Sequence, residues 1–254
     1  MDNIIYAGGS DRGKVRERNE DSFLCYSFDN SDVSLLIVAD GVGGYAGGAE
    51  ARQIAVETMQ ASVEKALLLA HSGGGYAEKW LDLTLKQAMS DANSEIIHQQ
   101  KEHIKFNNMS STVVALLFKN NEMVLSYLGD SRCYQYIEQA LTQLTEDHTY
   151  LQDMLNAGNI SQKEFETLPM HNVISQALGL KIGPTITTQH FVLDKNITYL
   201  LCSDGLTNCL SDAQIKKILQ TIEPLDECVD ELIASANDNG GVDNISVVLL
   251  RVNA

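Results

Sequence analysis

Residues 34–44, SLLIVADGVGG, constrain the fold more than any other part of the chain. The apolar run 35–39 is typical of a strand that is buried on both faces. The run ends at Asp40, and a turn dense in glycine follows it. A carboxylate at the mouth of a buried strand is poorly solvated unless a cation compensates its charge. Asp40 is therefore interpreted either as a metal ligand or as the cap of the helix predicted after the glycines.

Further carboxylates lie at the ends of other predicted strands. Asp130 and Asp204 each follow an apolar run, and Asp243 immediately precedes one. In an antiparallel sheet, strand ends of opposite sense meet at one edge, so we expect these side chains to converge with the first. Glu20 and Asp21 precede another strand-like run and are candidates for the same cluster. Taken singly, each carboxylate is as compatible with a structural role in a turn or cap.

The chemistry of such a cluster favours divalent cations. Carboxylates within a few ångströms of one another repel, so the group either holds protons or binds metal. Oxygen ligands, without paired histidines or cysteines at ligand spacing, favour Mg²⁺ or Mn²⁺ over zinc. Two such ions suit phosphoryl hydrolysis, because they bind phosphate oxygens and acidify a water to make it a nucleophile.

Composition narrows the range of partners. The 254 residues include 18 lysines and arginines against 34 aspartates and glutamates, a net charge of −16. This charge repels nucleic acid and anionic membranes, so we expect neither as a partner. No run approaches the roughly 18 apolar residues of a membrane-spanning helix, and the N-terminus has no signal-peptide pattern. Five cysteines without a CxxC pair suggest reduced thiols, so we expect a cytoplasmic protein. We also expect it to act as a monomer.

The order of predicted elements indicates an α+β fold in one domain over residues 1–254. Helices arrive in pairs between groups of strands, which favours packed sheets with helices outside over alternating βαβ units. Residues 145–180 are polar and helix-like, and we interpret them as an excursion from the sheets. The predicted strands are 3–9, 22–28, 35–39, 112–118, 123–128, 132–137, 185–193, 197–203 and 244–252, with a hairpin turn at 120–121. The predicted helices are 50–69, 77–105, 211–222 and 225–238.

Eight short segments, in order along nearly the whole chain, carry a family resemblance. They are RERNED (16–21), VADGVGG (38–44), SST (110–112), GDSR (129–132), LTEDH (144–148), SQALG (175–179), CSDGL (202–206) and GGVDNIS (240–246). With this set the chain resembles the metal-dependent serine/threonine phosphatases of the protein phosphatase 2C (PPM) type, in their compact bacterial form.

The resemblance implies a central β-sandwich of two antiparallel sheets flanked by pairs of helices, a four-layer αββα arrangement. It implies a flap insertion at about 145–180, beside the site. The implied reaction is hydrolysis of phosphoserine or phosphothreonine by direct attack of a water that a binuclear Mg²⁺ or Mn²⁺ centre activates. The implied partners are phosphorylated proteins, namely bacterial serine/threonine kinases and their substrates.

The resemblance also implies a role for each site residue by its position. Arg16 is expected to grip the substrate phosphate, since a planar guanidinium fits a phosphoryl group, although the loop position also suits an ordinary surface arginine. The metal roles are Asp40 bridging two ions, Asp204 and Asp243 holding one, Glu20 and the Gly41 carbonyl holding the other, Asp21 behind a metal-bound water, and Asp130 with Asp204 at a weaker third site.

Two departures from the family pattern concern proton transfer and the helix start. Some relatives carry a histidine two residues after the bridging aspartate, or a little later, where this chain has Val42 and Tyr45. The proton for the leaving group then comes from water or another side chain, with His148 as a candidate against a structural role in the flap. Glu50 is one place later than usual, which leaves the start of the following helix open.

Three other interpretations compete. The glycines after Asp40 imitate a dinucleotide-binding fingerprint, but the flanking order is not βαβαβ. A phosphatase-like fold that only binds phosphoproteins would be expected to have lost metal carboxylates, whereas all of them are present. A calcium loop of the DxDxDG type is absent from the sequence.

Overall fold

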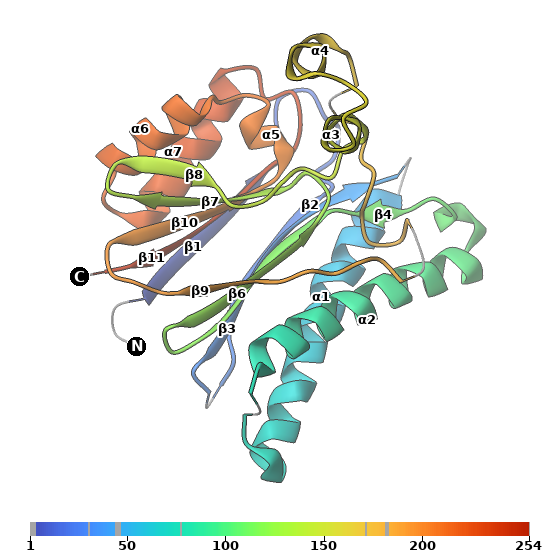
Figure 1. Ribbon diagram of the computed structural model, residues 1–254, viewed down its shortest axis with the longest axis vertical. Coiled ribbons are helices and arrows are strands. Elements are labelled where there is room, and N and C mark those ends of the chain that lie inside the picture. Colours follow the sequence, from blue (N-terminus) through green and yellow to red (C-terminus); the bar gives the residue numbers. More distant parts are fainter. Residues whose placement is uncertain are drawn as a thin grey trace.

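The computed structural model describes residues 4–29, 31–43, 47–76, 78–170, 172–180 and 183–253. Two antiparallel β-sheets pack face to face at its centre, and a pair of helices covers the outer face of each sheet (Figure 1). This arrangement confirms the predicted αββα sandwich. Among the described residues, no helix is both long and apolar enough to cross a lipid bilayer.

The first sheet has the strand order β1-β11-β10-β7-β8, and every neighbouring pair is antiparallel. Its central strands are buried on both faces, because helices cover one side and the second sheet covers the other. Its strands are β1 (Ile4–Asp11), β7 (Arg132–Ile137), β8 (Ala140–Gln143), β10 (Ile197–Cys202) and β11 (Ile245–Val252).

The second sheet has the order β2-β3-β5-β6-β9, with the short strand β4 paired to the end of β3. The predicted strand at 35–39 is the middle of β3, and its first seven residues are buried. The strands are β2 (Asp21–Ser27), β3 (Val33–Val42), β4 (Ser110–Ser111), β5 (Val113–Lys119), β6 (Glu122–Leu128) and β9 (Gln189–Val192).

Three layers of apolar side chains hold the sandwich together. One lies between the two sheets and includes Leu36, Leu116 and Tyr199. The others lie between each sheet and its helices, as expected where every sheet face must be covered. The helix pairs are α1 (Gly47–Leu69) with α2 (Trp80–Glu102) on the second sheet, and α6 (Asp212–Thr221) with α7 (Leu225–Asp238) on the first.

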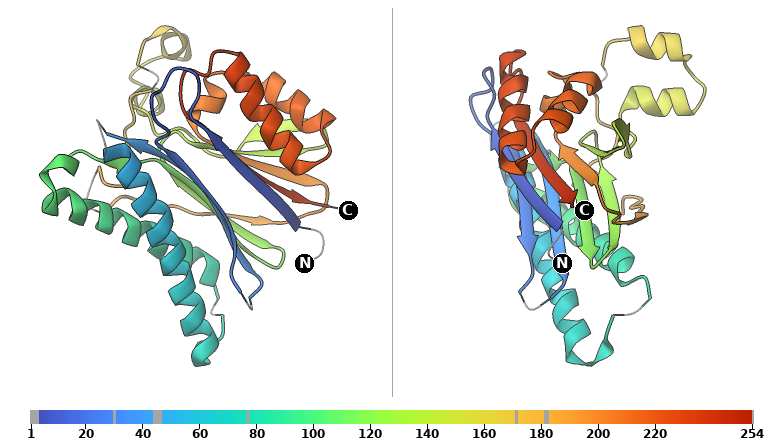
Figure 2. Two further views of the ribbon diagram at one scale, coloured as in Figure 1. Left: turned by 180° about the vertical axis from the view of Figure 1, so that it is seen from behind. Right: turned by 90° about the vertical axis from the view of Figure 1, so that its left-hand side faces the viewer.

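Residues 145–180, called the flap from here on, contain two short helices that project beyond the sheets (Figure 2). The two flap helices are α3 (Tyr150–Asn156) and α4 (Gln162–Thr167). The remaining helical segments are short, and they are α5 (Asp204–Thr207), a π-turn (Ala70–Gly74) and a 3₁₀ turn (Ile104–Phe106).

Three predicted boundaries were wrong. The strand predicted to stop at Asp40 continues for two residues, because Gly41 and Val42 pair with β4. The helix predicted over 77–105 begins after Lys79, whose φ of 62° is left-handed, and ends at Glu102. The extended His103 separates it from the 3₁₀ turn, and Ala77 lies outside the described residues. The strand predicted over 185–193 is only β9. Strand β8 was missed altogether.

Candidate active site

A cavity of about 450 Å³ lies at one end of the sandwich. It is formed where the residues just before β2 and β11 and the start of α5 meet the end of β3, the loop after β6 and one side of the flap. Seven of the predicted site residues line it, together with five that were not predicted. The lining residues are Arg16, Glu20, Asp40, Gly41, Val42, Gly43, Asp130, Asn172, Ile174, Asp204, Asp243 and Asn244.

Backbone contacts fix Asp40 at the cavity wall. Its carbonyl oxygen accepts from the Thr112 N–H at 2.9 Å and from the Ser111 hydroxyl at 3.1 Å. Its own N–H donates to the Thr112 hydroxyl at 3.2 Å. The serines and threonine of the SST segment therefore hold the strand that carries this carboxylate, although their individual roles were not predicted.

Asn244 organises the loop that precedes β2. Its side-chain amide donates to the carbonyls of Arg12 and Arg18, both at 2.8 Å, and its Oδ1 accepts from the Glu20 N–H at 2.7 Å. Arg16 lies in the loop held in this way, and its guanidinium meets the Asp243 carboxylate with an Nη2–Oδ2 distance of 2.6 Å. One asparagine thus brings residues from the two ends of the sequence to the same cavity.

Two glycines permit backbone approaches that any side chain would prevent. A Cβ on Gly205 would lie 1.9 Å from the Asn244 carbonyl oxygen, so only glycine lets α5 contact the start of β11. A Cβ on Gly48 would lie 2.7 Å from the Gly41 carbonyl oxygen and 3.0 Å from Glu20 Oε2. These two oxygens, which were predicted to hold the same ion, thus lie on one side of the cavity.

Asp21 lies behind the cavity lining and is buried. It is paired in register with Asp40, and its Oδ2 accepts from the Ser203 hydroxyl at 2.6 Å. Ser203 also accepts from the Ser246 N–H at 3.0 Å, so this carboxylate links the two sheets below the cavity. Its place behind the other carboxylates is compatible with the supporting role that the family resemblance implies.

Burial and mutual repulsion make the cavity costly for negative charge. Desolvation, followed by the charges of neighbouring aspartates, raises the pKa of Asp40 well above its usual range. The same causes raise the pKa of Asp204, and burial raises the pKa of Asp130 to about 7. For Asp21, burial raises the pKa to about 6 although hydrogen bonds from serines oppose it.

The donor set fits divalent cations. Asp21, Asp130 and Asp204 each bury an Oδ1 that has no hydrogen-bond partner among the described residues. Among the described residues the lining has neither lysine nor histidine, and buried carboxylate oxygens without partners are the ligands that Mg²⁺ and Mn²⁺ take. No three acidic, histidine or cysteine side chains of the described part are grouped closely enough to form a metal site in this conformation, in which Asp243 contacts Arg16 and Asp204 contacts Asn208.

The flap contributes Asn172 and Ile174 to the cavity wall. His148, the predicted proton-transfer candidate, lies outside the lining. Its ring stacks on Tyr127 with centroids 5.1 Å apart, and its Nδ1 accepts from the Gly129 N–H at 3.2 Å. Val42 lies at the rim, and Tyr45 falls outside the described residues.

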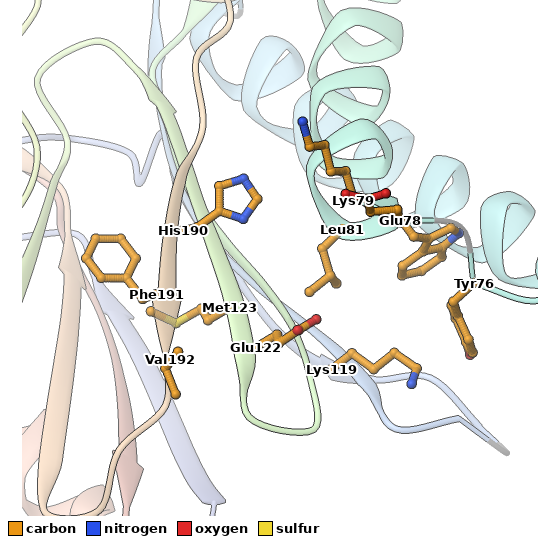
Figure 3. Close-up of a pocket in the computed structure, with 11 residues that line it drawn as sticks. Tyr76, Glu78, Lys79, Leu81, Lys119, Glu122, Met123, His190, Phe191 and Val192 are labelled. Carbon is orange, nitrogen blue, oxygen red and sulfur yellow. The ribbon is translucent and has the colours of Figure 1, made fainter.

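Another cavity, of about 520 Å³, lies between the start of α2 and the edge strand β9 (Figure 3). Its lining includes Tyr76, Trp80 and two lysine and two glutamate side chains, and it contains none of the predicted site residues. Strand β6 separates the two cavities, since Glu122 at its start lines this one and Asp130 follows its end. The acidic cavity is therefore the candidate active site.

A sandwich of two sheets between helix pairs, with carboxylates and one arginine lining a cavity at one end, has the architecture of the metal-dependent phosphatases that the sequence resembles. Comparisons with known proteins agree. The family described as protein phosphatase 2C matches residues 9–249. The serine/threonine phosphatase Stp of Listeria innocua is 35% identical over 247 residues, which are 96% of this chain and 94% of that protein. The PstP phosphatase of Mycobacterium tuberculosis is 36% identical over 98% of this chain and 45% of its own length.

Solved structures give the same result. The crystal structure of the M. tuberculosis phosphatase PstP superposes with a TM-score of 0.84 at 33% identity, covering 99% of this chain and 100% of that one. The catalytic domain of PstP in complex with two manganese ions has a TM-score of 0.79 at 33% identity, over 99% of each chain. The chain belongs to the protein phosphatase 2C family and is a metal-dependent serine/threonine protein phosphatase.

Proposed function

We propose that the acidic cavity binds two Mg²⁺ or Mn²⁺ ions and removes phosphate from phosphoserine and phosphothreonine in proteins. The observation that supports this most directly is the convergence of five carboxylates and one arginine, from distant parts of the sequence, on the lining of one cavity. Buried carboxylate oxygens without partners need cations, and cations in turn attract a phosphate that a net charge of −16 would repel.

Each side chain has a distinct role in this proposal. Asp40 would be shared by both ions, Asp204 and Asp243 would hold one, and Glu20 with the Gly41 carbonyl would hold the other. When bound, the ions neutralise phosphoryl oxygens and lower the pKa of a water that attacks phosphorus directly. Asp21 would orient that water from behind, and Asp130 would contribute with Asp204 to a weaker third site.

Arg16 is proposed to bind the substrate phosphate. Its side chain is 54% exposed at the cavity rim and bonds Asp243 with only one terminal nitrogen. A guanidinium offers five donors, so a phosphoryl oxygen pair can be bound by the fork of an arginine that a carboxylate already orients. Its contact with Asp243 therefore keeps the phosphate-binding group directed toward the acidic cavity.

The proposal also covers the substrates, the oligomeric state and the location of the protein. We propose that the substrates are phosphoproteins, which the names of the relatives support, and that they include serine/threonine kinases and the proteins these phosphorylate, as the family resemblance implies. We also propose one catalytic domain that acts as a monomer in the cytoplasm. The five cysteines support this location, since none of them forms a disulfide in the structure and three are buried.

The test is hydrolysis of p-nitrophenyl phosphate and of a phosphothreonine peptide with added Mn²⁺, Mg²⁺ or chelator. We expect turnover only with metal, and a loss of at least about 100-fold in Asp40→Asn and Asp204→Asn, because each removes a charged ligand from the centre. Metal binding, measured by calorimetry on the same variants, should weaken together with turnover.

The matched control is Asp230→Asn, which changes an exposed aspartate on α7 and should retain full activity. Folded, metal-loaded protein without turnover on either substrate would contradict the proposal. In that case the chain would be examined as a protein that binds phosphoproteins without hydrolysing them.

A further inference from the structure

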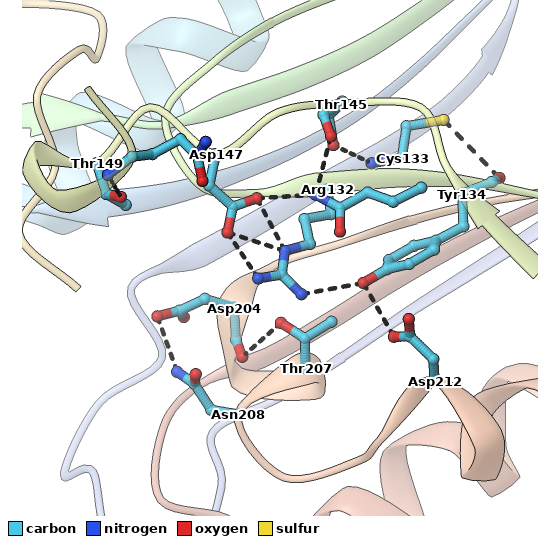
Figure 4. A network of polar contacts seen from close by, with 12 residues as sticks. Arg132, Cys133, Tyr134, Thr145, Asp147, Thr149, Asp204, Thr207, Asn208 and Asp212 are labelled. Atoms are coloured by element: carbon cyan, nitrogen blue, oxygen red, sulfur yellow. Dashed lines mark hydrogen bonds and ion pairs between the residues drawn. The ribbon is translucent and has the colours of Figure 1, made fainter. Parts of the chain in front are cut away.

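Arg132 and Asp147 form an ion pair that ties strand β7 to the base of the flap (Figure 4). The Nη2 of the arginine lies 2.6 Å from Oδ2 of the aspartate, and its Nε lies 2.9 Å and 3.0 Å from the two carboxylate oxygens. The remaining nitrogen, Nη1, donates to the hydroxyl of the fully buried Tyr134 at 3.0 Å. All three guanidinium nitrogens are therefore used, in a fork geometry that lysine cannot reproduce.

A second contact next to the ion pair holds the other end of the loop between β6 and β7. The N–H of His148 donates to the Gly129 carbonyl at 2.9 Å, and its ring accepts from the Gly129 N–H. Asp147 and His148, which form the base of the flap, therefore bind the chain on both sides of Asp130. His148 contacts Gly129, and Asp147 contacts Arg132. Asp130, between these two anchor points, lines the catalytic cavity, so the flap is held directly beside that cavity.

The segment at which the flap ends, residues 173–175, is hydrogen-bonded to the segment at which it begins, residues 148–150. Thr149 and Ile174 form an antiparallel bridge, and the Tyr150 N–H donates to the Val173 carbonyl at 2.8 Å. The Ser175 N–H donates to the His148 carbonyl at 2.9 Å. Through these bonds the place of Asp147 determines where Ile174, which lines the cavity, lies.

We propose that Arg132 and Asp147 are positioning residues which hold the flap base and thereby form the wall that a phosphoprotein substrate meets. This inference rests on the proposed phosphatase function and adds to it a preference for phosphopeptides over small aryl phosphates. Asn172 and Ile174 of the flap line the cavity, and we expect them to contact the peptide chain that carries the phosphate, whereas a small aryl phosphate has no peptide chain to contact them. The ion pair therefore serves peptide substrates selectively.

The alternative is that the ion pair only stabilises the sheet. The side chains of Arg132 and Asp147 are 28% and 19% exposed, so breaking the pair leaves a poorly solvated charge and costs stability under either interpretation. A purely structural role predicts parallel losses on every substrate. A positioning role predicts a larger loss on peptides and a flap that opens more often.

The experiment compares Arg132→Lys and Asp147→Asn with the wild-type enzyme in Mn²⁺, on a phosphothreonine peptide and on p-nitrophenyl phosphate. We expect KM for the peptide to rise about 10-fold, the usual effect of losing a charge-assisted contact, and kcat/KM for the aryl phosphate to stay within about 2-fold. Amide hydrogen exchange at residues 149–175 should become about 10-fold faster without a change in β5.

The control is Arg251→Lys, which alters another arginine of the same sheet that bonds Thr198 and the Glu223 carbonyl. It should leave the ratio of the two substrates unchanged. Equal losses on both substrates, or unchanged flap exchange in both variants, would overturn the proposal. If wild-type protein hydrolyses neither substrate, the phosphatase function fails instead, while the exchange measurement still tests whether the pair holds the flap.

Discussion

At the scale of single residues, Asp130 shows how burial makes the candidate site unfavourable for an ionised carboxylate. It is buried, its Oδ1 has no hydrogen-bond partner in the described part of the chain, and the Asp204 charge opposes its ionisation. These causes raise its pKa to about 7, whereas an aspartate in an unfolded chain ionises near 4. The folded, metal-free protein therefore holds this proton more tightly than the unfolded chain does.

The resulting prediction concerns metal-free stability. Because the folded pKa is raised, the favourable contribution of protonated Asp130 is complete below about pH 4 and is lost as the pH rises through about 7. Asp130→Asn should therefore raise the free energy of unfolding in chelator at pH 8, by up to about 4 kcal/mol, and change it much less at pH 5. Urea denaturation at both pH values measures this.

Saturating Mn²⁺ serves as the control for that measurement. Cations compensate the carboxylate, so the gain from the substitution should shrink or reverse when metal is present. Equal effects of the substitution at pH 5 and pH 8 in chelator would contradict the assignment of strain to this ionised carboxylate.

At the scale of elements, periodicity and apolar runs were sufficient to predict both helix pairs and most strands. The errors arose where a distant segment decides the outcome. β3 extends past Asp40 only because Ser110 and Ser111 pair with it. β8 follows a tight turn at Glu138 and Gln139, which adopt positive φ although neither residue type favours it, so the local sequence carries no turn signal.

The site was predicted in part for the same reason. Carboxylates at strand ends could be inferred to meet, because antiparallel strands bring such ends to one edge. The contributions of Asn172, Ile174 and Asn244 were missed, since asparagine and isoleucine in loops carry no signal of what they contact across the fold. His148 was proposed for proton transfer from its motif position, and only the coordinates reveal that its ring bonds Gly129.

The contact between α5 and β11 leads to a prediction at this scale. Gly205→Ala places a methyl group against the Asn244 carbonyl and forces the two elements apart, which separates Asp204 from Asp243. We expect a loss of about 2 kcal/mol or more in the free energy of unfolding, together with a fall in metal affinity. Urea denaturation and calorimetric metal titration measure the two effects.

The matched substitution is Gly73→Ala, in the turn between α1 and α2. Its φ of 143° strains any side chain, but a methyl group there meets nothing within 4 Å. It should cost stability through backbone strain alone and leave metal affinity unchanged. If both variants retain normal metal affinity, the close approach at Gly205 does not position the carboxylates.

At the scale of the whole molecule, the net charge of −16 should act on the substrate before any contact forms. Phosphopeptides with lysine or arginine beside the phosphoresidue are expected to have lower KM values at low ionic strength than peptides with acidic neighbours. Raising the salt concentration from about 0.02 to 0.3 M should reduce the difference between these KM values, because screening shortens the range of the protein's electrostatic field. A preference for acidic peptides at low salt would contradict this.

The arrangement of the first sheet also bears on how the chain acquires activity while it is being made. β1 contributes residues from the start of the sequence, yet it pairs with β11, which is synthesised last among the described elements. Such distant pairing makes folding slow, since a long loop must close before the contacts form. Until β11 is made, the growing chain lacks Asp243 and the strand that pairs with β1, so a partly synthesised chain cannot complete the proposed metal site.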